Sequence, residues 1–256
     1  MRKIIGIANQ KGGVGKTTSA INLSASLATA EKRTLLIDSD AQGNATTGLG
    51  IDRTSIDHAN LYHTLIGQKT LQEVIVHTCL PYLDLIPADQ NLIGVEVEFV
   101  GIKDREKRLK FLLKDANLPY DYVIIDCPPS LGFLTVNALV AADCLIVPLQ
   151  CEYFAMEGLG HLLNTVKLIR AGLNPSLNLG GILLTMFDSR NLLSHRVCED
   201  VKKHFGSKVF NTVIPRNVRL SECPSHGLPI ILYDIKSRGA MAYMELAHEI
   251  LQNGRF

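Results

Sequence analysis

The sequence has no tryptophan, only 6% aromatic residues, and 26 Lys and Arg against 25 Asp and Glu. A net charge of +1 excludes a protein that binds polyanions through its overall charge, so any nucleic-acid affinity must come from a local basic surface. The six cysteines form no C-x-x-C pair and no Cys/His cluster with zinc spacing. No signal-peptide pattern precedes the first apolar run, and we expect a cytoplasmic protein with reduced thiols.

Only one apolar stretch is long enough to suggest a membrane span. Residues 131–151 contain a single charged side chain, Asp143, and a helix of that length could cross a bilayer. Polar residues and Pro148 interrupt the stretch, however. It is better interpreted as a helix over 131–141, a turn, and a buried strand over 144–149.

Apolar runs alternate with helical periodicities along the whole chain. We predict strands over 3–8, 33–37, 82–87 (edge-like), 122–126, 144–149, 179–186 and 209–214, and helices over 16–30, 62–66, 104–116, 131–141, 155–171, 192–205 and 238–252. Continuously apolar strands are typical of sheets covered on both faces. The alternation predicts an α/β fold with a doubly wound, mostly parallel sheet, and residues 1–256 are expected to form a single domain.

A glycine-rich segment joins the first strand to the first helix. Residues 9–18 read Asn-Gln-Lys-Gly-Gly-Val-Gly-Lys-Thr-Thr. Glycines let the backbone turn its N–H groups toward an anion, and the helix N-terminus adds partial positive charge. The order of strand, loop and helix predicts a phosphate-binding loop in a P-loop NTPase-like domain. Its expected nucleotide-binding residues are Lys11, Gly12, Gly13, Val14, Gly15, Lys16, Thr17 and Thr18.

The loop departs from the generic phosphate-loop pattern in one respect. Gln10 occupies the position of the first glycine, and Lys11 adds a second lysine, which is the deviant form of the motif. Lys16 is expected to reach the β- and γ-phosphates of ATP, and the Thr17 hydroxyl to ligate Mg²⁺.

Carboxylates follow two of the predicted strands. Asp38 and Asp40 are two residues apart at the end of one strand, and Asp126 ends another. In a phosphoryl-transfer site such residues can hold the water shell of Mg²⁺ and orient the attacking water. Asp126 is similar to the Walker B carboxylate, which reaches Mg²⁺ directly or through water.

Together these motifs resemble the ParA/MinD family of deviant-Walker ATPases, and most closely its ParA/Soj partitioning branch. The resemblance covers nearly the whole chain and rests on residues 11–18, 38–44, 126–130, 148–158 and 214–217. The family's usual D-x-D-P-Q-G-N has Ala41 here in place of proline, which should leave that loop less stiff.

The resemblance implies an ATP-bound homodimer in which two protomers face each other. Lys11 is expected to reach the partner's phosphates, Asp40 to orient the water, and Asp38 and Asp126 to support Mg²⁺. Residues 152–158 are expected near the dimer interface. The adenine would be held by the strand end at residues 185–187, which includes Met186, and by the loop over residues 215–217, in which Pro215 would pack on the base and Asn217 would form a hydrogen bond to it.

The family also implies a function in DNA segregation. Its ATP-bound dimers bind double-stranded DNA without sequence preference, and a ParB/Spo0J-like centromere-binding protein stimulates slow hydrolysis. Residues 186–239 carry nine Lys and Arg against five Asp and Glu, a net charge of +4, whereas the rest of the chain has −3. Arg190 and Arg219 are the expected DNA contacts, in a cytoplasmic, nucleoid-associated protein. The basic faces at Lys202–Lys203 and on the 104–116 helix are either solvated or functional.

Two alternatives share the loop. A MinD-like membrane-associated positioning ATPase would end in a basic amphipathic helix, but residues 245–256 contain two Glu and one Arg. An iron–sulfur reductase would need two cysteines of each protomer at the dimer axis, for which Cys127 and Cys151 are the candidates.

Overall fold

The sheet of this protein has seven strands in the order β3-β4-β2-β5-β1-β6-β7. The computed structural model describes residues 2–56, 58–152 and 155–252. The strands are β1 (Lys3–Ile7), β2 (Thr34–Asp38), β3 (Val76–His77), β4 (Leu83–Ile86), β5 (Tyr122–Asp126), β6 (Cys144–Gln150) and β7 (Asn178–Thr185). All neighbouring strands are parallel except β3 and β4, and β1 lies between β5 and β6. The predicted doubly wound, mostly parallel α/β sheet is confirmed.

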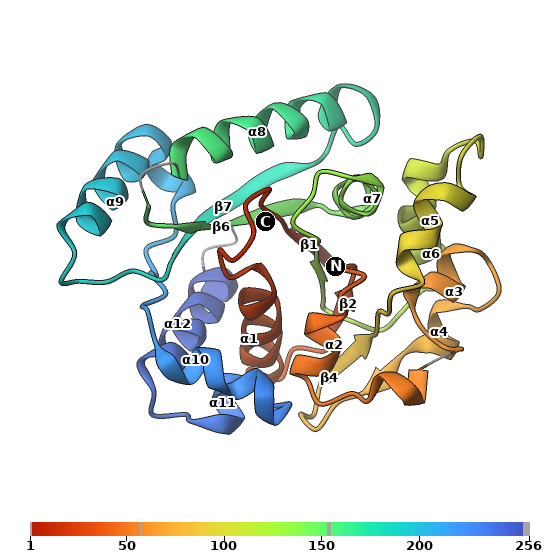
Figure 1. Ribbon diagram of the computed structural model, residues 1–256, viewed down its shortest axis with the longest axis horizontal. Helices are drawn as coiled ribbons and strands as arrows, with labels where there is room; N and C mark the ends of the chain where they lie inside the picture. The colour runs from red at the N-terminus through yellow and green to blue at the C-terminus, as the bar shows by residue number, and fades with distance from the viewer. Residues whose placement is uncertain (1, 57, 153–154, 253–256) are drawn as a thin grey trace.

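Helices cover both faces of the sheet (Figure 1). They are α1 (Lys16–Thr29), α2 (Asn44–Gly48), α3 (Leu61–Leu65), α4 (Leu71–Val74), α5 (Leu92–Glu98), α6 (Arg108–Asp115), α7 (Phe133–Ala141), α8 (Ala155–Gly172), α9 (Leu192–Phe205), α10 (Val218–Glu222), α11 (Ile230–Tyr233) and α12 (Arg238–Gln252). Helices α1 and α12 pack on one face of the sheet, and α7 and α8 pack on the other.

Continuous apolar strands build these two cores by alternation. In β5, Val123 and Ile125 point into the core that contains α7 and α8, whereas Ile124 points into the core that contains α1 and α12. All three side chains are fully buried. Because successive side chains of a strand point to opposite faces, an uninterrupted apolar run is what a sheet between two helix layers requires.

The predicted strand over 209–214 is wrong. This segment makes only isolated bridges, Ile182 with Val209 and Phe187 with Pro215. The N–H groups of Asn211 and Thr212 donate instead to the carboxylate of Glu249 on α12, at 2.9 and 3.0 Å. Those two bonds interrupt the ladder beside β7, so an apolar run that looks like a strand becomes a connecting segment.

Other differences concern short elements. The two-residue β3 was not predicted, and it makes the strand predicted as edge-like, β4, the second strand of the sheet rather than its edge. The helix and buried strand predicted within 131–149 are confirmed as α7 and β6. Among the residues described, no helix combines the length and hydropathy needed to cross a bilayer. Residues 153–154 of the fourth family motif and residues 253–256 of the C-terminal segment lie outside the described residues.

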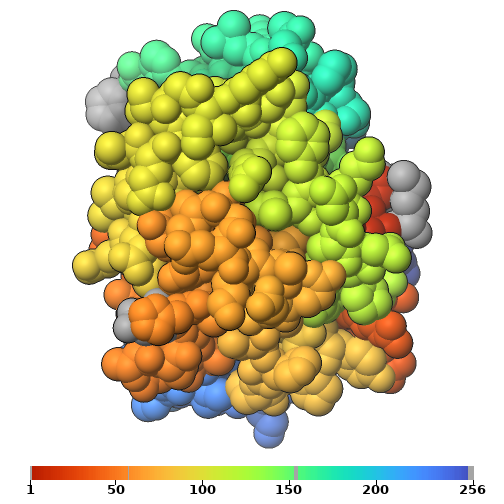
Figure 2. Space-filling view, turned by 90° about the vertical axis from the view of Figure 1, so that its right-hand side faces the viewer, coloured from red at the N-terminus to blue at the C-terminus, as the bar shows by residue number. Residues whose placement is uncertain are grey.

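The connection from β2 to β5 forms most of the face in Figure 2. This segment contains β3 and β4, followed by α5 and α6. Two apolar side chains of α5, Ile93 and Val97, are 61% and 74% exposed. The predicted site is carried by the segments that follow β1, β2, β5 and β7.

The packing of Gly181 against Phe210 gives a prediction for stability. A Cβ at Gly181 would lie 2.4 Å from Cε2 of Phe210, whose side chain is fully buried. We expect Gly181→Ala to displace that ring, costing about 2 kcal/mol and lowering the Tm by about 4–8 °C in thermal unfolding. Gly160→Ala in α8 is the matched control, because a Cβ there meets nothing within 4 Å, and its Tm should not fall. Equal Tm values for the two variants would contradict this account of the core.

Candidate functional site

The loop between β1 and α1 has the geometry of an anion cradle. Gly13 and Gly15 have φ of 73° and 87°, a region that L side chains rarely adopt. A Cβ at Gly12 or Gly13 would meet nothing within 4 Å, so open space faces the loop. Helix α1 has no side-chain cap and no acidic residue in its first turn. Its first N–H groups are therefore left for an external anion.

A cavity of about 270 Å³ lies against this loop. Its lining includes Asp40, Asn44, Pro129 and Met186, together with the loop residues Gly12, Gly13, Gly15, Lys16, Thr17 and Thr18. The side chain of Val14 is buried and is not part of this lining. Lys16 is buried, and its Nζ donates to the carbonyl oxygen of Lys11 at 3.0 Å. Burial lowers the pKa of Lys16, while the nearby Asp126, Cys127 and Asp40 act in the opposite direction. The cavity thus combines backbone donors, a lysine and a carboxylate.

Lys11 points away from this cavity. Its Nζ forms an ion pair with Oε2 of Glu152 at 2.5 Å, and Gln150 donates to the other carboxylate oxygen at the same distance. The backbone N–H of Lys11 donates to Asn9, whose amide in turn donates to the carbonyl oxygen of Pro148. The Lys11 side chain is 42% exposed. In a single chain Lys11 is therefore bound to the end of β6 and is not a lining residue of the phosphate cavity.

The register of the sheet brings Asp38 and Asp126 together, because they are paired residues of β2 and β5. Oδ2 of Asp38 accepts from the N–H and hydroxyl of Thr46, at 2.8 and 2.7 Å, and Oδ1 accepts from the N–H of Asp40. Burial raises the pKa of Asp38 to about 6, although these hydrogen bonds lower it. Asp38 is thus a buried carboxylate whose oxygens are already satisfied.

Asp126 differs from Asp38 because neither of its buried carboxylate oxygens has a hydrogen-bond partner. Burial, and next the charge of Asp38, raises its pKa well above the usual range, while the Thr17 hydroxyl, which faces the carboxylate without the geometry of a full hydrogen bond, and the charge of Lys16 act in the opposite direction. An orphaned buried carboxylate beside a phosphate cavity fits a place for a hydrated Mg²⁺. Within the described part of the chain, no three His, Cys, Asp or Glu side chains could hold a metal ion by themselves. An ion here would need further oxygens, such as those of phosphates and water.

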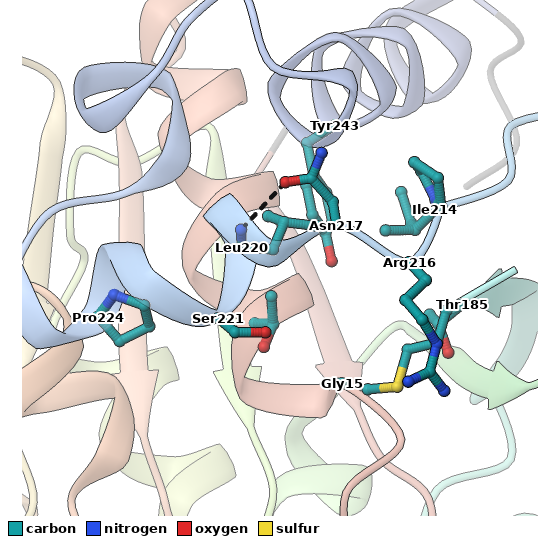
Figure 3. Close-up of a pocket in the computed structure, with 12 residues that line it drawn as sticks. Gly15, Thr185, Ile214, Arg216, Asn217, Leu220, Ser221, Pro224 and Tyr243 are labelled. Atoms are coloured by element: carbon teal, nitrogen blue, oxygen red, sulfur yellow. Dashed lines mark hydrogen bonds between the residues drawn. The ribbon is translucent and has the colours of Figure 1, made fainter. Parts of the chain in front are cut away.

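A second cavity, of about 280 Å³, continues from the loop toward α10 and α12 (Figure 3). Gly15, Met186, Pro215 and Asn217 line it, so the predicted adenine-binding residues do lie together. Met186 has a φ of 50°, an unusual backbone for a residue of its size, directly after β7. Asn217 also caps α10, accepting from the N–H of Leu220 at 3.3 Å. The mixed polar and apolar lining suits a planar base.

Several lining residues were not predicted from the sequence. They are Asn44 in the phosphate cavity and Leu220 and Tyr243 in the second cavity. Asn44 is the last residue of the acidic motif, so its position beside predicted residues was the available signal. Tyr243 is buried in α12 and bonded to Ser19 at 3.1 Å, and no pattern near it marks this contact.

The two predicted DNA-binding arginines have different surroundings. Arg190 lines a hollow of about 460 Å³ together with Arg216 and Arg238, whereas Arg219 is not among its lining residues. Arg190 makes a bidentate pair with Asp188, at 3.0 and 2.9 Å, and its side chain is 87% exposed. Arg219 pairs instead with Glu222 at 2.9 Å. Three arginines against one carboxylate leave the hollow net positive.

The two candidate iron–sulfur cysteines are buried thiols. Cys127 and Cys151 are 1% and 4% exposed. Burial raises the pKa of both thiols, that of Cys151 to about 12. Since a cluster needs thiolates at an accessible dimer axis, this environment does not favour a cluster ligand.

A family model and several curated proteins are similar to this chain over most of its length. The family model described as an AAA domain matches residues 2–179. The chain is 56% identical to the chromosome partitioning protein ParA of Myxococcus xanthus, over 98% of this chain and 88% of that protein. It is 55% identical to the sporulation initiation inhibitor protein Soj of Bacillus subtilis, over 99% and 100% of the two chains.

A solved structure with the same fold is a Mycobacterium smegmatis protein named cobyrinic acid a,c-diamide synthase, with bound ADP and magnesium. It is 37% identical, has a TM-score of 0.87, and aligns over 100% of this chain and 96% of its own.

The unpaired carboxylate of Asp126 gives a prediction of pH dependence. A raised folded-state pKa means that the folded protein keeps a proton which the unfolded chain releases near pH 4, so wild-type stability falls as pH rises above that value. Without Mg²⁺ and nucleotide, we expect Asp126→Asn to raise the Tm by about 2–4 °C at pH 7.5 and by less at pH 4.

Asp38→Asn is the matched comparison for this test. It removes an equally buried carboxylate that accepts three hydrogen bonds, so it should not show the same gain in Tm at pH 7.5. A lower Tm for Asp126→Asn at neutral pH would contradict an unpaired carboxylate at this position.

Proposed function

Because this chain belongs to the ParA/Soj family of chromosome-partitioning ATPases, we propose that it is an ATP-dependent DNA-segregation ATPase. In this proposal residues 1–256 act as one ATPase domain, and ATP drives two copies into a sandwich dimer that binds DNA without sequence preference. Hydrolysis to ADP and phosphate, slow until a partner stimulates it, releases the dimer from DNA. The identity of 54–56% with partitioning proteins carries more weight than the 37% identity with a protein named as a synthase.

The two connected cavities support the binding of ATP with Mg²⁺. Backbone N–H groups from Gly12 to Thr18 and the Lys16 ammonium would hold the phosphates. The Thr17 hydroxyl would ligate Mg²⁺, with Asp126 and Asp38 holding its water shell. Bound there, the ion would neutralise charge on the β- and γ-phosphates.

The adenine end of the site is formed by Met186, Pro215 and Asn217. Pro215 and Met186 supply apolar surface for the ring. The side-chain oxygen of Asn217 caps α10, and its NH₂ group would form a hydrogen bond to the base.

One observation carries the dimer proposal, namely that Lys11 lies outside the phosphate cavity of its own chain. It is bound to Glu152, and Lys16 is the only lysine that lines the cavity in the described part of the chain. Charge that develops on the γ-phosphate in the transition state needs a further cation, as an arginine finger supplies in other NTPases. We propose that the Lys11 of a second copy supplies it, after leaving its ion pair with Glu152.

Asp40 is proposed to orient the attacking water. It lines the phosphate cavity, is 9% exposed, and its Oδ1 accepts from the N–H of Gln42 at 3.0 Å. A carboxylate that is held by its own backbone and open to the cavity on one side can accept a hydrogen bond from water.

The arginine hollow is the proposed DNA-contacting surface. Arg190, Arg216 and Arg238 converge there, and a dimer would present the hollow twice. Contacts of this kind neutralise phosphates without reading bases, which gives binding that is independent of sequence and sensitive to salt. We include Arg219 as a second contact on α10. The protein would then be cytoplasmic and nucleoid-associated, with a ParB/Spo0J-like protein as its stimulating partner.

A membrane-associated positioning function is less well supported. Helix α12 buries Tyr243, Leu246 and Ile250 in the core with α1. Its apolar face is therefore already covered, and a membrane-binding helix would need that face free.

The first test of the proposal concerns Lys11. We expect Lys11→Ala to bind ATP with unchanged affinity but to lose at least about 100-fold in kcat with DNA and a ParB-like partner present, because charge stabilisation from the second chain is removed. Lys114→Ala, an exposed lysine of α6, is the control and should hydrolyse ATP like the wild type. Normal turnover by Lys11→Ala would refute the role of Lys11 in the partner's site. Rapid turnover by the wild type without DNA or partner would count against a partition switch.

The second test concerns DNA binding by the arginine hollow. With ATP present, Arg190→Glu should weaken retention of non-specific DNA about tenfold or more and reduce its salt dependence, because a phosphate contact is replaced by repulsion. Arg33→Glu makes the same change in net charge just before β2, at the opposite end of the strands from the site, and should bind DNA normally. Undiminished retention by Arg190→Glu would remove this surface from the proposal.

A further inference from the structure

Asp40 begins a tight turn that two hydrogen bonds close. The N–H of Gly43 donates to the carbonyl oxygen of Asp40 at 2.8 Å, which makes residues 40–43 a β-turn. The N–H of Gln42 donates to Oδ1 of Asp40 at 3.0 Å. The carboxylate is thus part of the turn itself, so any change in the turn moves the group that the proposed function assigns to the attacking water.

The sequence of the turn does not fix its shape. Ala41 occupies the second position, where proline is favoured because its ring presets φ near the required value. An alanine there leaves the backbone free to adopt other conformations, and this freedom is lost only if another group restrains the turn.

Arg53 supplies such a restraint from a separate element. Its Nη2 donates to the carbonyl oxygen of Gln42. A Cβ at Gly43 would lie 3.3 Å from that Nη2 and 2.8 Å from the carbonyl oxygen of Ala88. The guanidinium group and the chain after β4 therefore both pack closely against Gly43, with no room for a side chain there, and Gly43 has a φ of 60°.

Arg53 is anchored, unlike an ordinary surface arginine. It begins a short 3₁₀ helix, Arg53–Ile56, which Asp52 caps through a bond from the N–H of Thr54 at 3.0 Å. Ile56, at the other end, is 1% exposed. The Nε of Arg53 is buried without a hydrogen-bond partner. The guanidinium group therefore loses the hydration of one donor where it bonds to the turn, and this desolvation is part of the cost of its position.

We infer that Arg53 is a positioning residue, which holds the 40–43 turn, and with it the Asp40 carboxylate, in the arrangement that hydrolysis needs. This inference rests on the proposed function, since it assumes that Asp40 acts on the attacking water. Arg53 bonds to the backbone of the turn and is not among the described residues that line the phosphate cavity, so its effect should fall on turnover rather than on nucleotide affinity.

The test removes the hydrogen bond from Arg53 and replaces it with a proline at position 41 as the restraint on the turn. Arg53→Met keeps the length of the side chain and removes the donor. Ala41→Pro restores the preset φ, and it removes neither closing bond, because those come from Gln42 and Gly43. We expect Arg53→Met to lower kcat about fivefold to tenfold with KM for ATP unchanged, and the Ala41→Pro/Arg53→Met double variant to recover most of the loss. Arg33→Met is the matched control and should retain the wild-type kcat.

A second readout does not depend on catalysis. In nucleotide-free protein, amide hydrogen exchange of a peptide that covers residues 40–47 should be faster in Arg53→Met than in the wild type and slower again in the double variant. An unchanged exchange rate in Arg53→Met overturns the inference, whether or not the wild type hydrolyses ATP. A wild type that hydrolyses no ATP would count against the proposed function instead. Loss of kcat that Ala41→Pro fails to restore, in a variant with wild-type Tm, overturns it as well, because Arg53 would then act by its charge.

Discussion

The site depends on the parallel register that pairs Asp38 of β2 with Asp126 of β5. Two carboxylates held side by side in a dry interior repel each other and lose hydration, and burial is the largest cause of the raised pKa of each. Asp38 is compensated by Thr46 and by its own turn, and Asp126 is left without a partner. Without a ligand this arrangement costs stability, and a bound cation would remove that cost. The unfavourable energy is located beside the cavity that we propose for a metal–nucleotide complex.

The two lysines of the loop have opposite surroundings. Lys16 is buried beside carboxylates and faces the cavity, while Lys11 is half exposed and bound to Glu152. An exposed ion pair of this kind contributes little to stability, about 0–1 kcal/mol. In the proposed dimer, the phosphates of a nucleotide bound to the second chain could therefore replace Glu152 as the partner of Lys11. The pairing therefore gives a physical reason why one chain would bind nucleotide and yet hydrolyse it slowly. The 40–43 turn is likewise not fixed by its own residues, since Ala41 leaves its backbone free and the bond from Arg53 comes from a separate element.

Much of the fold could be predicted because its strongest patterns are local. The phosphate loop, the buried strands over 122–126 and 144–149, and the helix between them each have a period or a motif within a few residues. The segment over 209–214 shows the limit of this reasoning. It has the composition of a strand, but Glu249, some 40 residues later in the sequence, takes its N–H groups. No local pattern reports a competing acceptor that arrives from another helix.

The sequence by itself determined the α/β class, the cradle from Gly12 to Thr18 and the identity of the acidic strand ends, since each is encoded by neighbouring residues. Tertiary structure decided which of these groups face one another. It gave Arg190 and Arg219 different ion-pair partners, paired Lys11 with Glu152, left Asp126 without a hydrogen-bond partner and bonded Arg53 to the 40–43 turn. Those outcomes depend on strand register and on contacts between segments far apart in the chain. Periodicity and motif spacing describe only the positions of residues along the chain, so they could not have given them.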